Sequence, residues 1–171
     1  DRLRFDFTHP APVTPTQIVE IEKKVNNAIL ENSTIRVSNK KLKQALEEGA
    51  TALFGEKYGN DVRTISIGED APYSYELCGG THASTTGEIG VFLITSEGSA
   101  AAGIRRIEAV TGRKAFEIIR KRMSTMKKSA DYLECSIDDL CFSVKKLINE
   151  KQKLIDKMTK MSKVQALAIY R

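Results

Sequence analysis

The sequence has few of the side chains that bind metals or carry out nucleophilic catalysis. Its 171 residues include two histidines, His9 and His82, and three cysteines. Neither a closed four-ligand metal site built from neighbouring residues nor a Ser-His-Asp triad can be assembled from them. An odd number of cysteines does not make a disulfide framework and fits a reducing compartment. No apolar run approaches the ~18–20 residues that span a bilayer. We therefore expect a cytoplasmic protein, or one of an organelle matrix, that has no membrane partner.

The most informative stretch is Cys78-Gly79-Gly80-Thr81-His82. A thiolate and an imidazole four positions apart, with two glycines between them, can be turned onto one metal ion. Zinc suits this pair, because the two groups bind it at about 2.3 and 2.0–2.1 Å. The residues alone leave two alternatives open. One is a strand that runs into a Gly-Gly turn with a buried cysteine. The other is Cys78 as a nucleophile with His82 as its base, although no orienting third residue is apparent.

The charge is divided unevenly along the chain. The net charge is +5, but residues 1–112 carry 12 basic against 15 acidic residues, and residues 113–171 carry 15 against 7. The two parts therefore have net charges of −3 and +8. A basic arm of this kind favours contacts with the phosphates of a nucleic acid. The alternative is a solvated helix surface, since lysine is common on exposed helices.

Residues 1–112 have the pattern of an α+β domain with a mixed or antiparallel sheet and packed helices. Thr14, Pro15 and Gln17 form a capping-box signature for a first helix, and Ser38 or Asn39 could cap a second. We expect a turn at 68–72, and we interpret the small residues at 98–103 as a hairpin connection. Alternation predicts strands at 2–7 and 62–67. We also interpret 34–38, 73–77, 90–95 and 104–110 as strands.

Residues 113–171 are strongly helical. Apolar residues recur at threes and fours through the first part, and Ser136 is a good N-cap for the second. Beyond Ser136 the apolar residues form an imperfect heptad. We predict that 111–134 and 136–171 pack as an antiparallel hairpin with coiled-coil character. The heptad residues are Leu140, Leu147, Leu154, Met161 and Ala168.

Several motifs together resemble the editing domain of alanyl-tRNA synthetase. One is Glu76-Leu77-Cys78-Gly79-Gly80-Thr81-His82, followed by Thr86-Gly87-Glu88-Ile89-Gly90. The segments 2–9, 52–59 and 102–112 match in the same order. The resemblance covers residues 1 to about 112, and the helical remainder is similar in kind to the segment that follows the editing domain.

This resemblance implies a parent that is an alanine–tRNA ligase, and a hydrolytic centre that removes serine or glycine from mischarged tRNA(Ala). In that family a Cys-x-x-x-His pair and an upstream His-x-x-x-His pair hold zinc, and this chain has only the first, Cys78 and His82. Residues 1–112 of this chain would then be an editing domain truncated at its N-terminus, and residues 113–171 would be a helical arm. ATP and magnesium would serve an aminoacylation domain that the chain lacks, and the chain alone would be inactive.

The resemblance also suggests residues that contact tRNA. Arg105 and Arg106 lie on opposite faces of a predicted strand, so we expect at most one to face the site. Lys127 and Lys128 lie on the basic arm. The catalytic residue stays unassigned, and the parent could form a homo-oligomer. Two other functions stay open: a free-standing deacylase that edits in trans, and a non-catalytic module for tRNA binding or oligomerisation.

Overall fold

The computed structural model describes residues 2–52, 58–68 and 72–169, with side chains as far as residue 163. Most of the turn expected at 68–72 therefore lies outside the described residues, as does the side chain of Ala168. The chain divides into two compact units, Asp1–Glu117 and Ile118–Arg171. The boundary that we expect at residue 112 stays a prediction.

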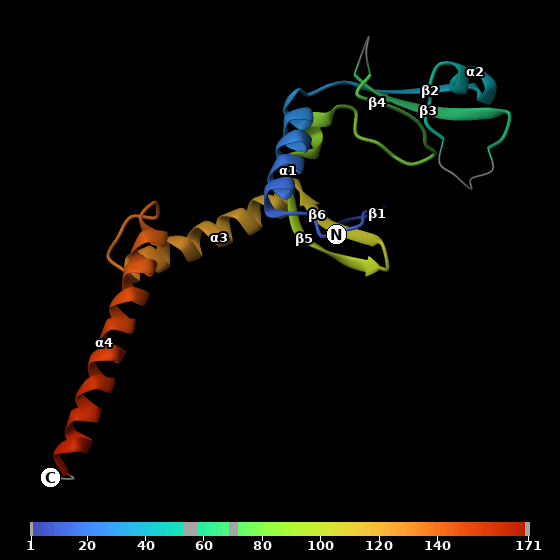
Figure 1. Cartoon of the computed structure of the whole chain (residues 1–171). Coiled ribbons are helices and arrows are strands. Elements are labelled where there is room, and N and C mark those ends of the chain that lie inside the picture. Colours follow the sequence, from blue (N-terminus) through green and yellow to red (C-terminus); the bar gives the residue numbers. More distant parts are fainter. Residues whose placement is uncertain (1, 53–57, 69–71, 170–171) are drawn as a thin grey trace. The chain divides into compact units, whose positions relative to one another are not determined.

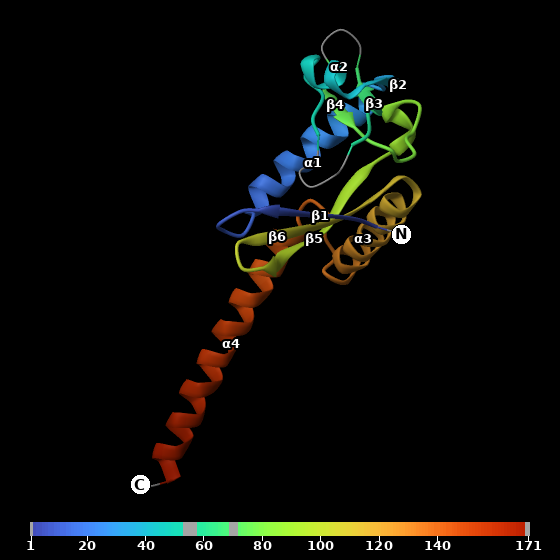
Figure 2. The ribbon, with the colours of Figure 1, turned by 90° about the vertical axis from the view of Figure 1, so that its right-hand side faces the viewer.

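The first sheet of unit 1 joins the two ends of that unit. It has the order β1 (Leu3–Thr8), β6 (Ile104–Thr111), β5 (Phe92–Ala101), and all of its pairs are antiparallel (Figure 2). The hairpin expected between β5 and β6 is confirmed, and it turns at Gly103, which has a φ of 71°. Most of the small-residue run belongs to β5 itself, since that strand extends to Ala101.

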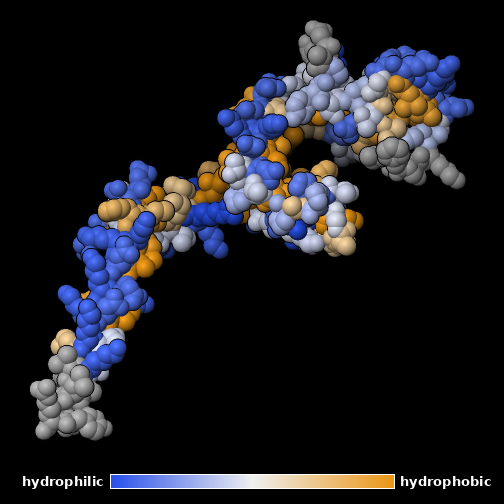
Figure 3. Space-filling model, viewed as in Figure 1, coloured by the Kyte–Doolittle hydropathy of each residue, from blue (hydrophilic) through white to orange (hydrophobic). Residues whose placement is uncertain are grey.

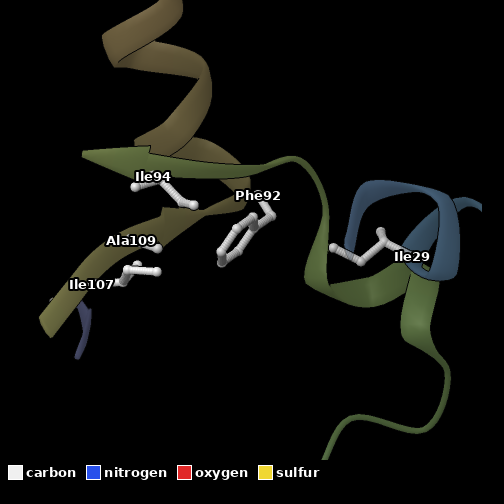
Figure 4. Packing of buried hydrophobic residues seen from close by; sticks show 5 residues of the cluster. All are labelled: Ile29, Phe92, Ile94, Ile107 and Ala109. Carbon is white, nitrogen blue, oxygen red and sulfur yellow. The ribbon is translucent and has the colours of Figure 1, made fainter. Parts of the chain in front are cut away.

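Helix α1 (Pro15–Leu30) packs on this sheet through an apolar cluster. The predicted capping box is confirmed: the Gln17 N–H donates to Thr14 Oγ1 at 3.3 Å, and the Thr14 N–H donates to Gln17 Oε1 at 2.9 Å. In Figure 4, Ile29 of α1 points toward Phe92 of β5. The buried cluster contains Ile29, Phe92, Ile94, Ile107 and Ala109.

The second sheet comes from one continuous stretch of chain. Its order is β2 (Ile35–Lys41), β3 (Asp61–Ile67), β4 (Ser74–Leu77), again antiparallel (Figure 1). Helix α2 (Leu42–Glu47) follows β2 directly. A second buried cluster is the core of the part formed by this sheet and α2. It contains Ala45, Ala50, Val62 and Leu77.

The structure confirms the α+β class and the antiparallel pairing, but it corrects two details of the prediction. There are two small sheets among the described residues where we expected one. The N-cap of α2 is Lys41, with no side-chain hydrogen bond, and neither Ser38 nor Asn39 caps it. The reason is that β2 continues through both residues, which pair with Thr64 and Arg63 of β3.

The two helices expected after residue 111 are present as α3 (Gly112–Tyr132) and α4 (Leu140–Ile169). Ser136 caps the turn that leads into α4, since its Oγ accepts the Asp139 N–H at 3.1 Å. Near the connection between the helices Ala130 is 2% exposed, but most of the apolar residues along both helices stay open to solvent, so the burial expected of a packed hairpin does not extend along their described residues. Met123, Leu147 and Leu154 are 46%, 53% and 60% exposed, and Figure 3 shows hydrophobic atoms beside hydrophilic ones along α4. Among the residues described, no helix is long and apolar enough to cross a membrane.

Candidate metal centre

The Cys-Gly-Gly-Thr-His motif begins where β4 ends. Leu77, the last residue of β4, is 3% exposed and belongs to the second core. The next residue continues the ladder, because the Cys78 N–H donates to the Arg63 carbonyl of β3 at 3.1 Å. A buried leucine and a strand hydrogen bond therefore fix the backbone on which the thiol is carried.

The turn after β4 brings the two predicted ligands together. His82 Nε2 lies 3.3 Å from Cys78 Sγ. For a tetrahedral zinc ion at the usual distances, the sulfur and nitrogen would be separated by about 3.6 Å. The observed pair is within a few tenths of an ångström of that spacing, so these two donors fit one zinc ion.

Gly80 keeps the space beside both donor atoms open. A Cβ atom at this residue would lie 3.5 Å from Cys78 Sγ and 3.9 Å from His82 Nε2. A methyl group would therefore touch both donors and fill part of the space next to them. A Cβ at Gly79 would meet nothing within 4 Å, so of the two glycines only Gly80 borders the donors.

The far end of the turn is held by Glu88, in the short helix η1 (Thr86–Ile89) that the sequence analysis missed. Its carboxylate accepts hydrogen bonds from the Ser84 hydroxyl and from the Ser84 N–H, the latter at 3.2 Å. These bonds lower the pKa of Glu88, the hydroxyl contributing most. Thr86 is 4% exposed and donates to the Ala28 carbonyl of α1 at 2.8 Å. Both ends of the turn are thus anchored.

A complete ligand set is not present in the part of the chain that the structure describes. No group of three or more histidine, cysteine, aspartate or glutamate residues there could hold a metal ion. His9 follows β1, a strand of the other sheet, and its Nδ1 lies 2.6 Å from the Ala11 carbonyl. Glu76 accepts the Ser74 hydroxyl at 2.5 Å. Among the described residues, Cys78 and His82 are therefore two donors at ligand spacing without a third beside them.

The four residues suggested for tRNA contact have different surroundings. Arg105 makes a two-pronged ion pair with Glu97, at 2.6 and 2.7 Å, and both side chains are 14% exposed. Arg106 makes a similar pair with Asp6, with both distances at 2.6 Å, at a more exposed position. The hydrogen bond from Arg105 is the main cause that lowers the pKa of Glu97. Lys127 and Lys128, on α3, are exposed.

Sequence reasoning missed the partners of these arginines and the role of Arg63. The Nη1 of Arg63 donates to the carbonyl of Cys78 at 3.0 Å and also to the carbonyl of Gly80. Alternation marked Arg63 only as a strand residue. The one signal available was register, since an antiparallel pairing of the two predicted strands would set residue 63 opposite residue 78.

The sequence of this segment matches known proteins. Residues 62–108, which include Arg63, Cys78 and His82, match the family described as the threonyl and alanyl tRNA synthetase second additional domain. The alanine–tRNA ligase of Alkaliphilus oremlandii is 47% identical over 150 residues, which is 88% of this chain. The chain belongs to the alanyl-tRNA synthetase family.

Other relatives agree with this assignment. The alanine–tRNA ligase of Clostridioides difficile is 44% identical over 90% of the chain, and that of Stenotrophomonas maltophilia is 42% identical over 98%. The chain spans only 17–19% of the length of these three relatives. The similarity continues into the helical part, because the match to the Stenotrophomonas enzyme includes nearly the whole chain.

Proposed function

We propose that this chain is part of the editing centre of an alanine–tRNA ligase and contributes to hydrolysis of Ser-tRNA(Ala) or Gly-tRNA(Ala). The observation that supports the proposal is the 3.3 Å approach of His82 Nε2 to Cys78 Sγ, within a segment homologous to these enzymes. Editing is needed because a synthetic pocket separates amino acids of similar size by only about 1–3 kcal/mol. A second, hydrolytic site then removes the errors.

The chain's own residues would supply two of the four zinc ligands. When bound, zinc would polarise the ester bond or orient water near it. Cys78 and His82 would hold the ion through Sγ and Nε2, and Gly80 leaves the space beside both donors free of side-chain atoms. The resemblance assigns the other two ligands to a His-x-x-x-His pair in the preceding sequence of the family. The chain alone would then be inactive.

Contacts with tRNA phosphates are best supplied by the arm. Lys127 and Lys128 are exposed, and the arm has a net charge of +8. Arg105 would have to leave Glu97 before it could bind a phosphate, and Arg106 would have to leave Asp6. Of the two arginines, Arg106 is the better candidate because its ion pair is the more exposed.

We also propose a cytoplasmic location, which the three unpaired cysteines support because a reducing compartment keeps thiols free; they are Cys78, Cys135 and Cys141. A homo-oligomer of the parent enzyme remains a prediction. A free-standing deacylase would carry the same zinc half-site. It differs from a synthetase by the absence of alanine activation, so the experiment below measures both activities.

The test uses the full-length protein that carries this segment, with Cys78→Ala as the variant and Cys141→Ala as the matched control, and alanine activation by the parental protein distinguishes a synthetase from a free-standing deacylase. Cys141 is an exposed thiol of α4, outside the zinc half-site. We expect Cys78→Ala to lose bound zinc and Ser-tRNA(Ala) hydrolysis, and to keep alanine activation. Cys141→Ala should keep all three. Deacylation at the parental rate in Cys78→Ala would refute the proposal.

Zinc removal separates the metal role of Cys78 from a role as nucleophile, since the 3.3 Å spacing is also short enough for a thiol–imidazole pair. If Cys78 is a ligand, a chelator should abolish deacylation, and added zinc should restore it. A thiol nucleophile would work without the ion, and its activity would survive the chelator.

A further inference from the structure

The turn that carries Cys78 and His82 has two consecutive glycines, and this makes its conformation costly to maintain. Glycine loses more backbone freedom on folding than any other residue. A Cβ at Gly79 would meet nothing within 4 Å, so nothing packs against that residue on this side. A zinc half-site needs the opposite property, because both donor atoms must be in position before the ion arrives.

Arg63 is placed to supply that rigidity. Thr64 pairs with Leu77 in the β3–β4 ladder, so the next pair outward sets Arg63 opposite Cys78. The Cys78 N–H donates to the Arg63 carbonyl at 3.1 Å. The backbone of residue 63 therefore holds the first residue of the turn, and its side chain is directed along the same edge.

The guanidinium of Arg63 then bridges two carbonyl groups of the turn. Its Nη1 donates to the Cys78 carbonyl at 3.0 Å and to the carbonyl of Gly80. These carbonyls flank the peptide units of the two glycines, so one planar group fixes the segment that is otherwise the most flexible. Gly80 is also the residue beside which both Sγ and Nε2 lie. Any rotation that frees the Gly80 carbonyl would move the backbone next to both donors.

We propose that Arg63 is a positioning residue of the zinc half-site, which holds Cys78 Sγ and His82 Nε2 at ligand spacing through the carbonyls of residues 78 and 80. This inference rests on the proposed function for its consequence, which is metal affinity. Its structural part, the clamp on the turn, does not depend on zinc. Partners that hold metal ligands in place typically contribute about 10- to 100-fold to metal affinity.

The first measurement is nitrogen-15 relaxation of the 171-residue chain without metal. We expect the backbone order parameters of residues 79–82 to be close to 0.85 in the parent chain and to fall below about 0.6 in Arg63→Ala. Lys41→Ala is the matched control. It removes a cation from the neighbouring strand β2 that pairs with Asp61 instead of the turn. Unchanged order parameters in Arg63→Ala would overturn the proposal.

Arg63→Lys guards against misfolding of the alanine variant. It retains the charge and most of the side-chain length but lacks the planar fork of the guanidinium. We expect order parameters between those of the parent and Arg63→Ala, with unchanged amide shifts in β3 and β4. Both bonds leave from one nitrogen, so the lysine ammonium can keep part of the clamp. Order parameters as low as those of Arg63→Ala, together with shifted amides in β3 and β4, would show that the turn loosens through damage to the sheet and would refute the clamp.

The second measurement is competition between a full-length synthetase that carries this segment and a chromophoric zinc chelator. Arg63→Ala should weaken zinc binding about 10- to 100-fold, and Lys41→Ala should not change it. If Arg63→Ala bound zinc with the parental affinity, the positioning role would be refuted even if the turn were more mobile. If the parental synthetase itself binds no zinc, the proposed function fails, and the relaxation data alone decide whether Arg63 holds the turn.

Discussion

The strand that leads into Cys78 is anchored by Leu77, so replacing this leucine with alanine should loosen the second sheet. The substitution removes three carbon atoms from a side chain that is 3% exposed. At about 0.8 kcal/mol for each buried carbon, the lost transfer free energy is about 2.4 kcal/mol. A residual cavity raises such costs toward 5 kcal/mol. Leu42 and Tyr75 are only partly buried beside it and can shift into the space, so we expect about 3 kcal/mol.

Leu46→Ala is the matched control for this prediction. Leu46 lies on α2, in the same half of unit 1, but it is 47% exposed. About half of its side chain is already in water, and its removal leaves no closed cavity, so the expected cost is about 1 kcal/mol. The comparison thus changes burial while it keeps the chemistry of the substitution constant.

Amide hydrogen exchange of β3 is the suitable assay, because it reports the opening of this sheet separately from the helices. A loss of about 3 kcal/mol corresponds to exchange more than a hundredfold faster. The amides of β5 and β6 serve as an internal reference, since those strands belong to a different buried cluster. A cost for Leu77→Ala no larger than for Leu46→Ala would refute the burial argument. Equal acceleration in β5 and β6 would show that the two clusters open together.

Three further predictions concern acid, zinc and salt. Hydrogen bonds from Lys40, and secondarily from Tyr75 and Gln44, lower the pKa of Glu48 to about 2. The contribution of the ionised Glu48 to folding stability should therefore be complete above about pH 4.5 and be lost as the pH falls toward 2. Glu48→Gln should flatten this part of an acid-unfolding curve. The isolated chain should retain little zinc after dialysis, because it supplies two ligands; stoichiometric zinc by metal analysis would mean that other residues complete the site. Replacing four lysines of the arm with glutamate should weaken tRNA binding and flatten the dependence of its affinity on salt concentration. An unchanged salt slope would assign these lysines to a solvated surface. The four are Lys127, Lys128, Lys145 and Lys146.

Local signals in the sequence were sufficient for most of the elements. The capping box at Thr14 and Gln17 predicts the start of α1 correctly because both hydrogen bonds join residues three apart. The alternation around Val62 to Ile67 predicts β3, whose buried positions include Val62, Thr64 and Ile65. In the same way, the Cys-x-x-x-His spacing predicts the meeting of two donors that the structure places 3.3 Å apart.

Interactions between distant residues were not accessible in this way. Arg63 reaches a carbonyl 15 residues further along the chain, and Arg106 pairs with Asp6 across 100 residues. Neither interaction produces a periodic pattern in the sequence, because each depends on which strands pair and in which register. The prediction of one sheet was wrong for the same reason, since alternation identifies strands and says nothing about which of them pair. The missed cap of α2 follows from the length of β2, which pairing with β3 extends.

The two sheets differ in how much chain must be made before each can form. Every strand of the β2–β3–β4 sheet lies within one continuous run, from Ile35 to Leu77. Within the described part of the chain, by contrast, β1 pairs with β6 alone, as in the contact between Asp6 and Arg106. Closing a loop of about 100 residues costs roughly 2 kcal/mol more in chain entropy than closing one of about 10. On the ribosome, β1 therefore emerges before any other strand of unit 1 and waits longest for its partner. Folding of the sheet that leads into Cys78 and His82 does not depend on that delay.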